Sequence, residues 1–264
     1  MYAFELQQAK SVADAAAALA RTGGRPLAGG QSLVSAMKLR LAQPGTLVDL
    51  SAIPELRGIC KDGAAIVIGA MTRHAEVAAS ADVKVAIPAV AALAEGIGDR
   101  QVRNMGTLGG AIAHSDPAAC WPAALLGLNA TVLTSRGRHA ADKFFTGMYE
   151  TALAPDEIIT AVSFPVPRRA AYLKFRNPAS RFALVGVFVA QAADGAVRVA
   201  VTGAASSVFR CTPLEQALSK SFTADAAKAV KVGEQGLNGD LHATPAYRAH
   251  LIPVLAARAV ATLA

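Results

Sequence analysis

The 264-residue sequence contains little that could build a metal centre. Its three cysteines, Cys60, Cys120 and Cys211, lie far apart, and none belongs to a CxxC pair or a cysteine–histidine cluster. The five histidines are equally scattered. This spacing lacks the usual zinc and iron–sulfur motifs, and it offers no Ser–His–Asp or Cys–His arrangement for nucleophilic catalysis. We therefore expect no metal ligands and no catalytic side chains here, and unpaired thiols fit a reducing cytosol.

Long apolar runs and patterned charge are also lacking. No run reaches the roughly 18–20 apolar residues that a membrane-spanning helix needs, and residues 1–20 lack the basic and apolar regions of a secretory signal. We therefore expect a cytoplasmic protein without a membrane span. The basic residues behind the net charge of +7 are scattered instead of interleaved with aromatics, which argues against nucleic-acid binding. Attraction to an anionic dinucleotide or to an acidic partner subunit would account for the charge equally well.

Two glycine pairs stand out against this background. Gly109 and Gly110 lie between apolar residues, and a polar run from His114 to Asp116 follows before Pro117. Glycine lets a backbone approach a ligand closely and adopt conformations that a side chain forbids. We therefore interpret residues 107–117 as a loop that lines a ligand. An ordinary turn is the alternative interpretation.

The upstream pair, Gly29 and Gly30, lies between a short apolar run and a segment with helical spacing. A glycine turn that leads into a helix presents unpaired N–H groups and the positive end of the helix dipole, which suits a pyrophosphate. Gln31 and Ser32 can add side-chain donors. The motif is neither GxGxxG nor GxxxxGK[ST], so it predicts neither a Rossmann fold nor a P-loop.

Six blocks in one order carry a more specific signal: AGGQSLVSAMKLRLAQPGTLVDLS, IGAMTRHAEV, RNMGTLGGAIAHSDPAA, YETALAPDEIITAVSFP, YLKFRNPASRFALVGV and DLHATPAYRAHL. They run from Ala28 to about Leu251. With them the sequence resembles the FAD-binding medium subunit of the molybdenum hydroxylases, the family of bacterial carbon monoxide dehydrogenase and xanthine dehydrogenase. The resemblance implies an α+β chain whose residues 1–167 form a two-lobed FAD-binding domain of the PCMH/vanillyl-alcohol-oxidase type, with lobes of about 1–55 and 56–167.

Residues 168–264 are expected to form a C-terminal α+β domain. Pro165-Val166-Pro167 is typical of a linker, since two prolines so close prohibit helix and weaken sheet. The pattern predicts a three-stranded antiparallel sheet followed by a helical bundle, with strands over 171–175, 184–191 and 196–203 and helices over 213–220, 224–237 and 247–263. In the first domain it predicts helices over 11–22, 31–41, 71–79, 86–95 and 121–128, and strands ending at 28 and over 46–50, 65–68, 130–134 and 158–164, with a connector over 142–156.

The function that the resemblance implies is electron transfer. In this family a molybdenum-cofactor large subunit oxidises the substrate and a 2Fe-2S small subunit carries the electrons. FAD on the medium subunit then passes the electrons to an external acceptor such as NAD, quinone or oxygen, within a dimer of heterotrimers. The cofactor performs the difficult step, and the protein holds and tunes it.

The resemblance also assigns the cofactor contacts. The pyrophosphate and its neighbours would be wrapped by Leu27, Ala28, Gly29, Gly30, Gln31, Ser32 and Leu33. A second set, Thr107, Leu108, Gly109, Gly110 and Ala111, would run along the FAD.

Four further positions match residues near the cofactor in the family: Ile97, Asp116, Ile159 and Lys174. Each has an alternative interpretation, namely a core residue for the two isoleucines, a turn starter for the aspartate and a solvated strand charge for the lysine. Many relatives read HADPAAD where this chain reads HSDPAAC. Cys120 therefore replaces a carboxylate, which puts one FAD contact in doubt.

Two other functions stay open at this point. One is a self-sufficient FAD-dependent oxidase, which would need a substrate domain of its own. The other is a scaffold subunit that has lost FAD, for which Cys120 is the sequence hint.

Overall fold

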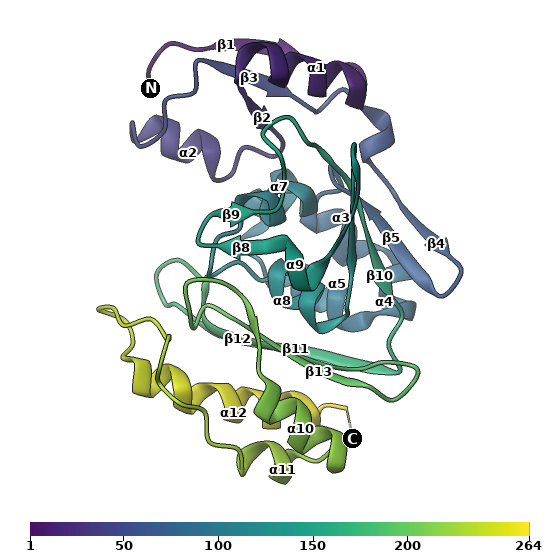
Figure 1. Ribbon diagram of the computed structural model, residues 1–264, viewed down its shortest axis with the longest axis vertical. Helices are drawn as coiled ribbons and strands as arrows, with labels where there is room; N and C mark the ends of the chain where they lie inside the picture. Colours follow the sequence, from purple (N-terminus) through teal and green to yellow (C-terminus); the bar gives the residue numbers. More distant parts are fainter. Residues whose placement is uncertain (264) are drawn as a thin grey trace.

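The computed structural model describes residues 1–263, which stack as three layers along the longest axis (Figure 1). The N-terminal layer is a three-stranded parallel sheet in the order β1-β3-β2 with two helices. Its elements are β1 (Glu5–Gln8), α1 (Val12–Thr22), β2 (Arg25–Leu27), α2 (Leu33–Lys38) and β3 (Thr46–Asp49). Ala15 and Leu19 of α1 are buried in one cluster with Val48 of β3.

Local sequence explains most of this layer. The Ser11 side chain accepts a hydrogen bond from the N–H of Asp14, and Gly23 ends α1 with a φ of 61°. The predicted helix over 11–22 and strands near 28 and 46–50 are therefore confirmed. Strand β1 was not predicted, because three of its four residues, ELQQ, are polar and the strand is mostly exposed. The predicted helix over 31–41 is too long, since α2 ends at Lys38.

The middle layer is a five-stranded antiparallel sheet in the order β4-β5-β10-β6-β7. The strands are β4 (Ile59–Asp62), β5 (Ala65–Gly69), β6 (Thr131–Thr134), β7 (Gly137–Ala140) and β10 (Ile159–Pro165), with a small pair of β8 (Phe145–Gly147) and β9 (Glu150–Thr151) beside it. The helices are η1 (Pro54–Leu56), α3 (His74–Ala79), α4 (Ala81–Ala86), α5 (Pro88–Glu95), α6 (Arg100–Met105), α7 (Leu108–His114), α8 (Trp121–Gly127) and α9 (Ala141–Phe144). Trp121, Phe144 and Phe164 are fully buried in its core.

The predicted loop over 107–117 is wrong in its first part, because it begins with helix α7. The Thr107 side chain accepts a hydrogen bond from the N–H of Gly110 at 3.2 Å and so caps the helix. Neither Gly109 nor Gly110 has a positive φ. The helix was not predicted from the sequence because the pair contains two glycines, and glycine is a poor helix former. Helix α6 was also missed, although Asp99 caps it by accepting from the N–H of Val102 at 2.9 Å.

Two smaller predictions for this layer also need correction. The predicted helix over 71–79 begins too early: α3 starts at His74 after its N-cap Arg73, and the Thr72 hydroxyl bonds the backbone of Gly58 at 3.0–3.1 Å. The predicted connector over 142–156 contains α9, β8 and β9.

The C-terminal layer is an antiparallel sheet in the order β11-β12-β13-β14 with three helices. Its elements are β11 (Arg169–Arg176), β12 (Ala183–Gln191), β13 (Val197–Thr202), β14 (Phe209–Arg210), α10 (Thr212–Lys220), α11 (Ala224–Lys228) and α12 (Pro245–Ala261). The three predicted strands are confirmed, and the two-residue β14 adds a fourth. The predicted helix over 224–237 is wrong beyond Lys228, where a loop follows in which Gly236 has a φ of 78°.

Strand β12 shows how this sheet lies between two layers (Figure 1). Val185, Val187 and Val189 pack toward the C-terminal helices, whereas Phe188 and Ala190 belong to the core of the middle layer. Alternate side chains of a strand point to opposite faces, so one strand contributes to both cores. Because both of its faces are covered, β12 is an almost continuous apolar run.

Candidate cofactor site

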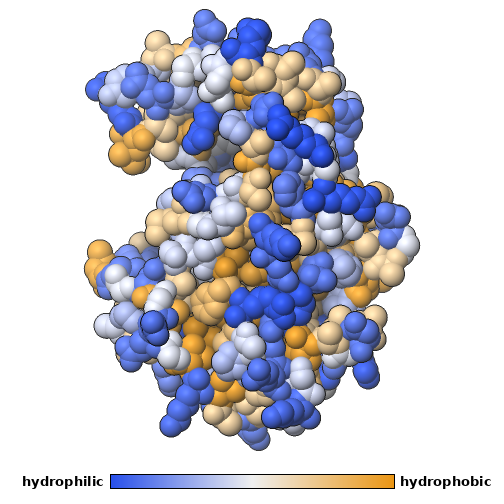
Figure 2. All heavy atoms as spheres, viewed as in Figure 1, coloured by the Kyte–Doolittle hydropathy of each residue, from blue (hydrophilic) through white to orange (hydrophobic). Residues whose placement is uncertain are grey.

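Figure 2 shows a hollow in the surface between the N-terminal layer, where α2 lies, and the middle layer, where α7 and β9 lie in Figure 1. The two glycine segments of the sequence approach each other here. A methyl group added at Gly29 would overlap the carbonyl oxygen of Met105 and lie 2.8 Å from the Cα of Gly106. A methyl group added at Gly110 would lie 3.3 Å from the Cβ of Ala28. The first glycine segment, residues 27–33, is therefore in direct contact with the second glycine segment, residues 105–111.

The first segment presents unpaired backbone donors. Gly30 has a φ of 69°, which turns the chain before α2. Within residues 1–263, none of the N–H groups of residues 29–33 donates a hydrogen bond. The carbonyl of Gly30 is used, since it accepts from Val34 at 3.0 Å. A run of free N–H groups around a left-handed residue forms a concave site suited to anionic oxygens.

The second segment is built differently, because its donors are mostly used. The N–H groups of Leu108 and Gly109 donate to the carbonyls of Thr72 at 3.1 Å and Ala70 at 2.8 Å. A methyl group added at Gly109 would lie 2.6 Å from the Cβ of Ala70. Gly109 therefore permits tight packing of α7 on the end of β5. Thr107 is an exception in the described part of the chain, because it is buried and its N–H has no partner there.

A buried histidine and a tryptophan support this second segment. The backbone N–H of His74 donates to the carbonyl of Gly106 at 3.0 Å, and the Trp121 Nε1–H donates to His74 Nδ1 at 3.1 Å. Burial, and secondarily the charge of Arg103, lower the pKa of His74 to about 4, so the imidazole is neutral near pH 7. Sequence reasoning did not single out His74, although it lies within the IGAMTRHAEV block.

Lys174 and Cys120 lie together between the middle and C-terminal layers. Lys174 Nζ is 3.3 Å from Cys120 Sγ, so Lys174 is not a solvated strand charge. Tyr172 lies on the same face of β11, and its hydroxyl is buried without a partner among residues 1–263. Burial raises the pKa of Tyr172 well above its ordinary value, and the neighbouring Cys120 adds to this shift. Cys120, Lys174 and Tyr172 therefore place polar atoms around the position at which many relatives have a carboxylate.

The remaining predicted residues occupy three kinds of position. Asp116 Oδ1 accepts from the N–H of Ala118 at 2.8 Å, as a turn starter does. Ile97 is half-buried after α5, and its carbonyl accepts from Arg103 at 2.9 Å. Ile159 is buried in the core of the middle layer, and Leu108 is fully buried, so its backbone alone can line the hollow.

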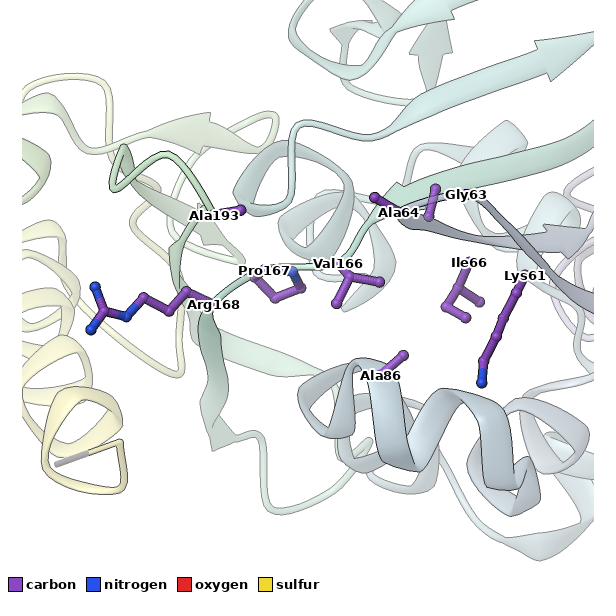
Figure 3. Close-up of a pocket in the computed structure, with 10 residues that line it drawn as sticks. Lys61, Gly63, Ala64, Ile66, Ala86, Val166, Pro167, Arg168 and Ala193 are labelled. Carbon is purple, nitrogen blue, oxygen red and sulfur yellow. The ribbon is translucent and has the colours of Figure 1, made fainter.

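A separate hollow of about 600 Å³ lies between the β4–β5 turn and the linker before β11 (Figure 3). Its walls are mostly alanine and other apolar residues, and Lys61 and Arg168 are the charged side chains that line it. Among the described residues, no carboxylate, thiol or histidine lines it, and neither does any of the predicted site residues.

Residues 1–263, which the structure describes, contain neither a cluster of metal ligands nor a membrane-spanning helix. No group of three or more histidine, cysteine, aspartate or glutamate side chains there could hold a metal ion. None of the helices there is both long enough and apolar enough to cross a bilayer.

The family model for the FAD binding domain in molybdopterin dehydrogenase matches residues 2–167. The chain belongs to this family. It is an FAD-containing oxidoreductase subunit of the molybdenum dehydrogenase type, which confirms the resemblance and the cofactor expected from the sequence.

Full-length relatives extend the similarity beyond the FAD-binding domain. The chain is 37% identical over 258 residues to the carbon monoxide dehydrogenase medium chain of Hydrogenophaga pseudoflava, covering 90% of both chains. It is 37% identical over 247 residues to the nicotine 6-hydroxylase medium subunit of Paenarthrobacter nicotinovorans, covering 89% of this chain and 87% of the relative.

Solved structures show the same similarity over nearly the whole chain. A carbon monoxide dehydrogenase structure from Hydrogenophaga pseudoflava superposes with a TM-score of 0.86 at 34% identity, covering 98% of this chain and 96% of that chain. Quinoline 2-oxidoreductase from Pseudomonas putida 86 gives a TM-score of 0.88 at 27% identity, covering 99% and 96%. The predicted fold class is thereby confirmed.

The geometry fits an FAD-binding medium subunit. The cofactor carries a diphosphate, and the free N–H groups of residues 29–33 are the kind of donors that a diphosphate needs. Gly29 and Gly110 keep the two segments in contact without side chains between them. The first segment contains no basic residue, so a diphosphate there would be held by hydrogen bonds from backbone N–H groups and from the side chains of Gln31 and Ser32.

Proposed function

We propose that this chain is the electron-transferring medium subunit of a molybdenum hydroxylase that consists of three kinds of subunit. The observation that carries the proposal is the run of free N–H groups at residues 29–33 beside the second glycine segment, in a chain of an FAD-binding family. Bound FAD would take electrons from an iron–sulfur partner and deliver them to an external acceptor.

The chain's own residues bind and orient the cofactor. Residues Leu27 to Leu33 would hold the diphosphate, with Gly30 shaping the turn, and residues Thr107 to Ala111 would form the opposite wall. Lys174 supplies a charge at the layer boundary, and Asp116 orders the turn before α8. Ile97 and Ile159 would contribute apolar surface near the flavin. None of these side chains is needed as a nucleophile or acid–base group.

The proposed partners are a molybdenum-cofactor large subunit and a 2Fe-2S small subunit, assembled as a dimer of heterotrimers. Support comes from relatives that are named medium chains or medium subunits. The acceptor would be NAD, quinone or oxygen. We also propose a domain boundary after residue 167, where the family match ends, and a cytoplasmic location, which stays a prediction.

Purification of the tagged chain from its native host tests the partnership. We expect the molybdenum and iron–sulfur subunits to co-purify in equal amounts, with molybdenum, iron and flavin present. A chain that carries FAD and reacts with substrate without partners would be a self-sufficient oxidase. A chain that purifies with partners but cannot bind added FAD would be a scaffold.

A pair of glycine variants tests the cofactor site. Gly30→Val and Gly63→Val both place a side chain at a positive φ, 69° and 56°, so both should carry a similar conformational cost of about 1–2 kcal/mol. Gly63 lies in the β4–β5 turn with open space around it. We expect only Gly30→Val to lose FAD. Equal flavin content in the two variants would show that the first segment is merely structural.

A further inference from the structure

His74 is a polar side chain with 4% of its surface exposed, directly beneath the second glycine segment. An isolated antiparallel bridge joins Arg73 to Thr107. Its two hydrogen bonds run from the His74 N–H to the Gly106 carbonyl and from the Leu108 N–H to the Thr72 carbonyl. The histidine is therefore held in fixed register with the wall of the cofactor site.

The hydrogen bond from Trp121 fixes which ring nitrogen of His74 carries the proton. An indole N–H can only donate, so His74 Nδ1 must accept and carries no hydrogen. A neutral imidazole has one N–H, which is then on Nε2. The pKa of about 4 keeps the ring neutral, and this tautomer therefore prevails over the range in which flavoenzymes usually work.

The Nε2–H group has no acceptor in residues 1–263. A methyl group added at Gly106 would lie 2.8 Å from Nε2, and Gly106 is also the residue that Gly29 approaches. The free donor thus lies where the two glycine segments meet. Nε2 is not one of the fully buried side-chain atoms without a partner, so it keeps accessible surface beside Gly106, where a ligand oxygen could accept its hydrogen.

We propose that the Nε2–H of His74 donates a hydrogen bond to the ribityl–diphosphate chain of FAD. The acceptor is an oxygen of that chain beside Gly106. Trp121 has a positioning role, since it selects the tautomer that presents this donor. The inference rests on the proposed cofactor site and adds an imidazole donor to the backbone N–H groups of the first segment.

The test compares three full-length variants after removal and re-addition of FAD. Trp121→Phe removes the indole but keeps the imidazole. His74→Phe in the Trp121→Phe background removes the donor without leaving a buried indole N–H unpaired. His74→Gln in the same background restores an N–H near the position of Nε2. The dissociation constant for FAD is measured by flavin fluorescence, and apo-protein stability is measured by urea unfolding.

We expect His74→Phe to weaken FAD binding roughly tenfold relative to Trp121→Phe alone, the usual effect of one lost hydrogen bond. His74→Gln should recover most of that affinity, although it does not restore the packing of the imidazole ring. Equal affinity in the phenylalanine and glutamine variants would overturn the proposal and make His74 a structural support.

Gly30→Val separates this inference from the site assignment. If Gly30→Val loses FAD while His74→Phe binds it normally, the site stands and the role of His74 is refuted. If neither change affects binding, the cofactor lies elsewhere.

Discussion

The two glycine pairs look alike in the sequence but differ in structure. Gly29 and Gly30 form a turn with unused N–H groups, and Gly30 needs its left-handed conformation. Gly109 and Gly110 lie in the first turn of a helix at ordinary φ values, and their N–H groups are bonded to Ala70 and Thr107. The first pair is suited to a ligand, and the second pair is suited to packing.

This difference shows what a glycine pair can and cannot indicate. The absence of a side chain serves either a backbone conformation, a ligand or a close approach between two elements. Hydrogen bonding separates these possibilities, because a packed backbone has its donors paired and a binding backbone has them free. The four positions should therefore respond differently to the same small substitution.

Gly29→Ala should have the largest effect, because it forces the two segments apart. The added methyl group would overlap the Met105 carbonyl, which is backbone and cannot rotate away. We expect FAD affinity to fall about a hundredfold, corresponding to roughly 3 kcal/mol. Equilibrium titration with FAD measures this, and Gly45→Ala in the same layer is the control, since it meets open space. Normal affinity in Gly29→Ala would show that the segments need not touch.

Gly109→Ala should act on folding before it acts on the cofactor. Its methyl group would lie 2.6 Å from the Cβ and 2.8 Å from the carbonyl oxygen of Ala70. Overpacking of this kind usually costs about 1–3 kcal/mol, which urea unfolding of the apo protein would detect. Ala70→Gly in the same chain should recover part of the loss by removing one of these contacts. A stable apo protein that fails only in FAD binding would contradict the packing role.

Acid should weaken the second segment through His74, whereas residues 27–33 contain no titratable group. Burial and Arg103 lower the folded-state pKa of His74 to about 4 from an ordinary 6.5. Neutral His74 thus stabilises the fold fully above pH 6.5, and this contribution is lost as the pH falls toward 4. Between pH 7.5 and 5.5 we expect a loss of roughly 1 kcal/mol.

Urea unfolding at both pH values measures the acid effect, and the difference from the His74→Phe/Trp121→Phe chain isolates it from the titration of carboxylates. Identical pH dependence in the two chains would mean that His74 is not buried neutral in solution.

The sequence was sufficient for the features that depend on local pattern. Helix α1 lies within the predicted range 11–22, between its N-cap Ser11 and Gly23, and the alternation of β12 between Val187 and Phe188 reflects the two cores that it joins. The family resemblance supplied the cofactor. Elements without a local signal, such as the polar strand β1, were missed.

The site was predicted less completely, because its geometry depends on contacts between distant residues. The sequence around Gly109 does not reveal that Ala70 occupies the space that a side chain at Gly109 would need. A lone histidine such as His74 gives no signal until Trp121 is known to donate to it. The sequence alone also does not show that Asp116 Oδ1 accepts from the N–H of Ala118 or that Ile159 lies in the core of the middle layer, and the proposed contacts of both with the cofactor stay predictions.

Gly110→Ala should have the smallest effect and is the sharpest test of the comparison. Gly110 has no positive φ, so alanine adds no backbone strain, and in a helix alanine gains up to about 1 kcal/mol over glycine. Its methyl group would meet Thr107 Oγ1 at 2.9 Å and Ala28 Cβ at 3.3 Å, so part of that gain is lost. We expect apo stability to change by less than about 0.5 kcal/mol and FAD affinity to fall only a few-fold. Paired urea unfolding and FAD titration measure both quantities. A large loss of FAD with unchanged stability would mean that Gly110 lies against the cofactor, and the second segment would then bind as the first does.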